Sequence, residues 1–149
     1  MKTKHLPVWS LASITLTVIL ASIVHFYEFG YRALVAGFAV IVVIWALLLL
    51  FRQTKNKVFL IFYGLLGLWN IIGFGLFNGF WNHVFKVFLT YLHNGYLPPM
   101  LSRLFLNPKI GSFIFETAGI LTFTASLFAA YYGYKFIRDV VKEEKNELN

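Results

Sequence analysis

The sequence contains no cysteine and few charged residues among its 149 residues. Without cysteine, the chain can form neither disulfides nor thiolate metal sites, Fe–S clusters or dithiol redox centres. Charged residues make up only 13% of the chain, against roughly a quarter in soluble globular proteins. The deficit extends along the whole length up to the C-terminal tail, so the sequence predicts no separate soluble domain.

Apolar residues dominate instead. They make up 59% of the chain, the aromatic fraction is 19%, and the mean hydropathy is +0.72. A helix needs about 20 predominantly apolar residues to cross a bilayer. Four segments meet this requirement, which predicts an all-α, four-helix transmembrane bundle in a single domain covering 1–149, with a charged tail at 135–149. The predicted helices cover residues 8–28, 32–51, 58–78 and 112–135.

The longest apolar run, 58–93, exceeds the length of one membrane crossing. Asn78-Gly79 interrupts its character near the middle, and the pattern then becomes amphipathic, with polar residues at helical spacing. We therefore expect an amphipathic helix at 80–93 that lies along the membrane surface, in the long loop between the third and fourth helices. Its polar stripe consists of Asn82, His83, Lys86, Thr90 and His93.

The distribution of basic residues predicts the topology. The chain has a formal charge of +7, but its bases flank hydrophobic segments, where they act as topology signals and contact lipid headgroups. The expected partner is therefore the lipid bilayer, of the plasma membrane, and not nucleic acid. Four bases fall on one predicted side (Arg32, Lys86, Arg103 and Lys109) and nine on the other (Lys2, Lys4, Arg52, Lys55, Lys57, Lys135, Arg138, Lys142 and Lys145). Positive charge favours the cytoplasm, which predicts cytoplasmic N- and C-termini.

This topology brings polar side chains together at the extracytoplasmic end of the bundle. Ionisable groups at membrane depth are costly and tend to face the bundle interior or a watery cavity. We therefore predict a ligand-binding site there. Its residues come from the ends of the four predicted helices and from the amphipathic helix: His25, Glu28, Arg32, Asn78, Asn82, His83 and Glu116.

Imidazoles and carboxylates suit a divalent metal ion such as zinc, iron or manganese, or a proton. The predicted metal ligands are His25, Glu28, His83 and Glu116. His25 and Glu28 lie one helical turn apart, as Glu and His do in helix-bundle metal sites. A haem held between His25 and His83 is a less favoured alternative. Asparagines 78 and 82 would orient the ligands, Arg32 would balance charge, and His93 could add a further imidazole.

Each of these residues also has a purely structural explanation. Glu28 and Arg32 have the spacing of an ordinary i,i+4 ion pair. Glu116 falls near a helix N-terminus, where the macrodipole favours a carboxylate. An imidazole on an interfacial helix, such as His83, would face water or headgroups. His25 lies inside an apolar span, where a hydrogen bond to a carbonyl would satisfy it.

Three kinds of function stay open at this point. The first is the binding of a metal, a proton or a small ligand at the polar site. The second is a non-catalytic accessory subunit or homo-oligomeric scaffold that packs against partner helices through small residues. The third is a membrane enzyme acting on a lipid-soluble substrate, although no P-loop, G-x-G-x-x-G, H-E-x-x-H or G-x-S-x-G motif assigns a reaction.

Two rows of small residues at helical spacing bear on this choice. Packing against a neighbouring helix explains both rows better than a water or proton path does. The first row contains Ser13, Thr17, Ala21 and His25, and the second contains Ala125, Ala129 and Gly133.

Overall fold

The computed structural model describes residues 5–105 and 111–147. Predictions that fall on 1–4, 106–110 and 148–149, among them the topology signals Lys2, Lys4 and Lys109, lie outside the described residues. Within the described part the fold is all-α. Its elements are α1 (Leu6–Phe29), α2 (Tyr31–Thr54), α3 (Lys57–Asn70), the π-helix η2 (Ile71–Phe85), α4 (Lys86–Leu92), α5 (Pro99–Ser102) and α6 (Phe113–Glu147).

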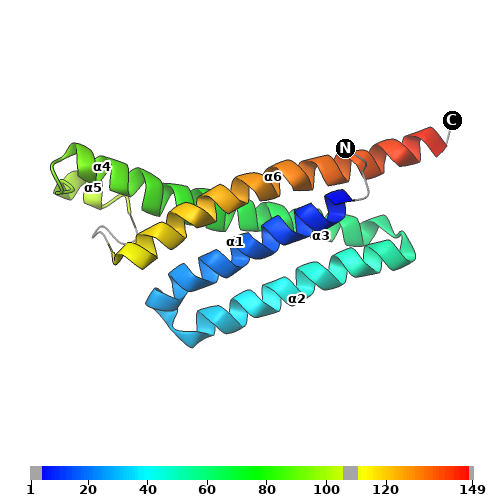
Figure 1. The fold of residues 1–149 in the computed structure, drawn as a ribbon, viewed down its shortest axis with the longest axis horizontal. Coiled ribbons are helices and arrows are strands. Elements are labelled where there is room, and N and C mark those ends of the chain that lie inside the picture. Colours follow the sequence, from blue (N-terminus) through cyan, green and yellow to red (C-terminus); the bar gives the residue numbers. More distant parts are fainter. Residues whose placement is uncertain (1–4, 106–110, 148–149) are drawn as a thin grey trace.

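Four helices of the described residues are long and apolar enough to cross a membrane: Leu6–Phe29, Tyr31–Thr54, Lys57–Leu92 and Phe113–Glu143. They lie alongside one another in an elongated bundle (Figure 1). One end, called the Gly30 end below, carries the α1–α2 turn together with α4 and α5. The opposite end, called the terminal end, carries the α2–α3 turn, the start of α1 and the end of α6. The predicted four-helix bundle is confirmed.

The α1–α2 connection is a single residue. Gly30 has φ 63° and ψ −149°, a conformation that is essentially restricted to glycine. Its backbone N–H donates to Phe26 O at 2.9 Å, which ends α1 and lets α2 begin at once. The two helices therefore form a tight antiparallel hairpin (Figure 1).

The third span is one uninterrupted helix. α3, η2 and α4 follow each other without a break, which corrects the expected boundary at Asn78-Gly79. Glycine here serves close approach instead of a turn: a Cβ at Gly79 would lie 2.7 Å from Phe123 N of α6. The wide π-helical turns and their glycines thus let η2 pack backbone to backbone against α6.

The predicted polar stripe exists, but it faces inward. Asn82, His83, Lys86 and Thr90 are all buried. No separate helix begins at residue 80, because 80–92 continues the third span. Within the stripe, His83 and Lys86 are directed at Glu116 of α6. The physical reason is that a buried ammonium group must be paired, and its partner, Glu116, lies on α6.

The two rows of small residues lie on α1 and α6, two helices that pack against each other. In α1, Ser13 and Thr17 are buried, and their hydroxyls donate to the carbonyls of their own helix, Ser13 to Trp9 O and Thr17 to Ser13 O. In α6, Ala125 and Ala129 are buried as well. Because these hydroxyls are hydrogen bonded within their own helix, the rows agree with helix packing better than with a water or proton path.

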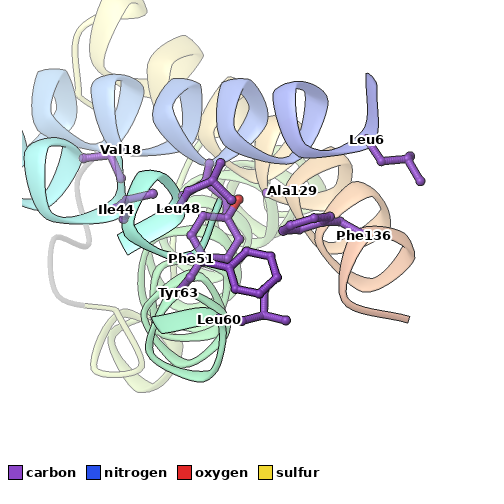
Figure 2. Close-up of a cluster of buried hydrophobic side chains, with 10 residues drawn as sticks. Leu6, Val18, Ile44, Leu48, Phe51, Leu60, Tyr63, Ala129 and Phe136 are labelled. Atoms are coloured by element: carbon purple, nitrogen blue, oxygen red, sulfur yellow. The ribbon is translucent and has the colours of Figure 1, made fainter. Parts of the chain in front are cut away.

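An apolar cluster holds the terminal half of the bundle together and joins α1, α2, α3 and α6 (Figure 2). At its centre the Tyr63 and Phe136 rings meet edge to face, with centroids 6.0 Å apart, and the Phe51 ring also meets Phe136 edge to face, at 6.3 Å. The Tyr63 hydroxyl is hydrogen bonded to Ser10 Oγ at 2.7 Å. This half carries the packing core, and the buried charges lie at the Gly30 end.

Candidate functional site

Three charged or titratable side chains from two spans meet at the Gly30 end. His83 Nδ1 donates to Glu116 Oε2 at 2.8 Å, and Lys86 Nζ donates to Glu116 Oε1 at 2.7 Å. The backbone N–H of Gly111 donates to the same Oε1 at 2.7 Å. Lys86 is 0% exposed, His83 1% and Glu116 7%. We call His83, Lys86 and Glu116 the buried triad.

Local structure fixes the position of the carboxylate. Glu116 lies in the first turn of α6, where the helix macrodipole favours a negative charge. Ser112 begins this helix: its hydroxyl accepts from Phe115 N at 3.3 Å, and its carbonyl accepts from Glu116 N. The Gly111 N–H then reaches the carboxylate itself. The helix macrodipole therefore explains why a carboxylate lies at position 116. Glu116 also has two side-chain partners, His83 and Lys86, which the macrodipole does not require.

Close packing fixes the position of the imidazole. A Cβ at Gly119 would overlap the His83 ring, so the ring occupies space that any other residue at 119 would fill. The Phe115 ring meets His83 edge on, with centroids 4.8 Å apart. Lys86 follows His83 by three residues and so lies one turn further along the same face. Both donors are thereby directed at one carboxylate.

The electrostatics of this arrangement are balanced when His83 is neutral. One carboxylate then faces one ammonium group, and each is removed from water. In such surroundings a charge is tolerated only when it is paired and hydrogen bonded. A second proton on His83 would leave the buried triad with a net positive charge.

A second histidine–glutamate pair lies at the same end of the bundle. His25 Nδ1 donates to Glu28 Oε2 at 3.0 Å, and Asn78 Nδ2 donates to His25 Nε2 at 3.3 Å. The His25 ring packs between Phe29 and Phe74, with centroids 5.8 and 5.6 Å away. The side chains of His25 and Glu28 are 25% and 29% exposed, so this pair is far less enclosed than the buried triad.

The structure thus divides the four predicted metal ligands into two pairs. Among the described residues, no group of three or more His, Cys, Asp or Glu side chains is placed to hold a metal ion. Both ring nitrogens of His25 are hydrogen bonded, to Glu28 and Asn78, which leaves neither free for a metal or a haem iron in this arrangement.

The supporting residues differ from expectation in three respects. Glu28 pairs with His25 and not with Arg32. Asn78 orients a histidine, as predicted for the asparagines, whereas the Asn82 amide donates to Phe77 O of its own helix at 3.1 Å. His93 is exposed at the end of α4, where its ring is bonded to Leu89 O, so it does not join the site.

Lys86 is the member of the buried triad that the predicted site does not include. The sequence assigns it only to the polar stripe of a helix on the membrane surface. A signal for its role was nevertheless present, because Lys86 is the single formally charged residue between Lys57 and Arg103. A lone charge in so long an apolar stretch favours a buried partner on another helix.

Comparisons of the chain with protein-family models, with curated proteins and with solved structures found no match. The fold alone is that of a multi-pass membrane protein with four helices of membrane-spanning character.

Proposed function

We propose that this protein is a small multi-pass membrane protein that binds and releases a proton at the buried triad. One observation supports this proposal above the others: the Glu116 carboxylate bridges an imidazole and an ammonium group, and all three are buried. Histidine is the side chain whose charge ordinarily changes between about pH 5 and pH 8. Ionisable groups inside a membrane span are, by default, functional candidates.

The proton would be taken up at Nε2 of His83. In the hydrogen-bonded arrangement Nδ1 carries a hydrogen directed at Glu116, so Nε2 holds the free electron pair. Proton uptake converts a neutral set of charges into a positive one in a place of low polarity. A water molecule or an anion can stabilise the added charge. A shift of α6 relative to η2 can do so as well, and proton binding would then be coupled to a movement of these helices.

The distribution of basic residues favours one orientation of the protein in the membrane. Among the described residues, the bases near the α2–α3 turn and in the last part of α6 lie at the terminal end and outnumber those at the Gly30 end, which favours a cytoplasmic location for the terminal end. The Gly30 end would then face the extracytoplasmic side of the plasma membrane. The buried triad would exchange protons with that side.

A metal ion is less well supported as the ligand. Lys86 already neutralises the Glu116 carboxylate at hydrogen-bond distance, and an ammonium group repels a cation. The proton is therefore the ligand that needs the least change in the observed arrangement.

The test is to observe the protonation state of His83 directly. The protein, with ¹⁵N-labelled histidine in lipid nanodiscs, would be titrated from about pH 5 to pH 8 by NMR. The His83 signal, assigned with the His83→Gln variant, should switch between neutral and charged forms. His93, whose ring is exposed at the end of α4, provides the comparison signal. A His83 ring that keeps one protonation state throughout would refute the proposal and make the triad a structural clamp.

A second function, that of an accessory subunit or homo-oligomeric scaffold, is favoured by a different observation. A groove of about 690 Å³ lies between α3 and α6 in the terminal half. Small residues line part of it, namely Gly64, Gly67, Ala130 and Gly133. Small residues let transmembrane helices approach closely, so the groove could receive a helix of a second copy.

Two alanine variants would test this second function. Ala130→Phe places a large ring in the groove, whereas Ala46→Phe places the same ring on the exposed face of α2. A scaffold predicts an oligomer in mild detergent that only Ala130→Phe dissociates, as measured by light scattering. A monomer for all three proteins would exclude the homo-oligomeric form of this function.

A further inference from the structure

A cavity separate from the buried triad lies between α1, α2 and η2. Its volume is about 400 Å³, within the range of ligand sites in proteins, roughly 300–1,000 Å³. Its walls are mainly apolar, with Phe29 and Phe74 among them, and its polar residues are His25, Arg32 and Ser22. α1 and α2 are both candidate membrane spans, which places the cavity beside lipid.

Small side chains on α2 create this space. A Cβ at Gly37 would overlap the Ser22 hydroxyl, so α1 and α2 approach each other closely at this point. Nearer the Gly30 end, Ala33 and Ala36 are too short to fill the gap against α1. Arg32 and Val40, at the two ends of the α2 lining, lie eight positions apart, or about 12 Å along the helix axis. The mainly apolar lining along this length suits an acyl chain.

A cation lies at the outer limit of this space. Arg32 is the second residue of α2 and is exposed. Its expected partner, Glu28, is bonded to His25 instead. Within the described part of the chain, Arg32 has no ion pair, so its guanidinium group is available to an anion. The guanidinium fork matches a phosphate group, which it can bind through two parallel hydrogen bonds.

We propose that this cavity binds a phospholipid, with its phosphate on Arg32 and one acyl chain between α1 and α2. The cation and the apolar cavity are arranged in the order in which a lipid presents its headgroup and its chain. The site shares no residue with the buried triad, so it goes beyond the proton-binding function and can be tested independently of it.

The experiment uses the full-length protein in nanodiscs that contain phosphatidylglycerol and phosphatidylethanolamine, followed by native mass spectrometry. We expect one phospholipid to stay bound per chain. Arg32→Gln should weaken retention about tenfold or more, since it removes a charge-assisted hydrogen-bonding group. Ala36→Phe should also weaken it, by filling the cavity. The matched controls are Arg52→Gln at the other end of α2 and Ala39→Phe on its exposed face outside the cavity.

The outcomes separate the alternatives. Retention of either phospholipid, lost in Arg32→Gln and kept in Arg52→Gln, supports recognition of the phosphate group that both lipids share. Equal retention by wild type and all variants would overturn the proposal, as would the absence of a bound lipid. Oleate, added in a parallel sample, is the probe for a fatty acid. Its retention in preference to phospholipid would also refute the site as proposed.

Discussion

Lys86 Nζ lies 2.7 Å from Glu116 Oε1, and both residues are buried although thirty positions separate them in the sequence. This ion pair ties the end of the third span to the first turn of α6. Together with the His83 bond to the other carboxylate oxygen, it links η2 and α4 to α6 at the Gly30 end of the bundle. Removing one partner would leave the other charge buried without compensation.

The first prediction concerns this ion pair. Lys86→Met and Glu116→Gln should each lower the free energy of unfolding by about 3–5 kcal/mol, the usual cost of breaking a buried pair. The double variant should lose much less than the sum, because no unpaired charge remains. Unfolding in mixed micelles would measure these values. The exposed Lys142→Met is the matched control and should change stability by less than about 1 kcal/mol. Additive losses would show that the two groups are not coupled.

A second prediction follows from the contact between Gly119 and the His83 ring. Gly119→Ala forces its new methyl group into the imidazole, which should cost about 1–3 kcal/mol through overpacking. It should also shift the His83 NMR signal, since the ring must move. Gly133→Ala, on the same helix, would bring its methyl group no closer than 3.7 Å to Ser10 Oγ and serves as the control. Equal stability of the two variants would contradict the observed packing.

The overall fold could be predicted from the sequence because membrane crossing requires long apolar helices, and four such segments stand out. The tight α1–α2 turn could be predicted as well, since few residues separate the two runs. The π-helix could not. Its widened turns depend on the contact of Gly75 and Gly79 with α6, whereas a periodicity argument assumes 3.6 residues per turn.

The boundary expected at Asn78-Gly79 explains why the predicted site does not include Lys86. With a helix boundary there, 80–93 becomes a separate helix on the membrane surface, and Lys86 has no reason to meet α6. The placement of His83 and Glu116 at one end was nevertheless sufficient to predict their proximity, and the structure bonds them directly. The division into two His–Glu pairs depends on side-chain packing around His25, between Phe29 and Phe74, which no sequence pattern reveals.

A third prediction tests the α1–α2 turn. Gly30→Ala should destabilise the protein by about 1–3 kcal/mol, because alanine rarely adopts φ 63° with ψ −149°. The cost would be purely conformational, since a Cβ at Gly30 would contact nothing within 4 Å. Gly73→Ala has equally open surroundings and no positive φ, so it isolates the backbone effect. Both variants would be compared by thermal unfolding in detergent, and equal melting temperatures would refute the explanation.

The last prediction contrasts the two histidines. His83→Ala removes a fully packed ring and leaves Glu116 with one hydrogen bond fewer in a buried place, so the loss should reach about 3–5 kcal/mol. His25→Ala removes a ring whose side chain is about a quarter exposed, and water can replace the lost bond to Glu28. Its cost should therefore stay near 1 kcal/mol. Chemical unfolding of both variants, with retention of helical circular dichroism as a check on folding, measures the difference. If His25→Ala were the more damaging of the two, the Asn78–His25–Glu28 chain, and not the buried triad, would be the main polar constraint at the Gly30 end.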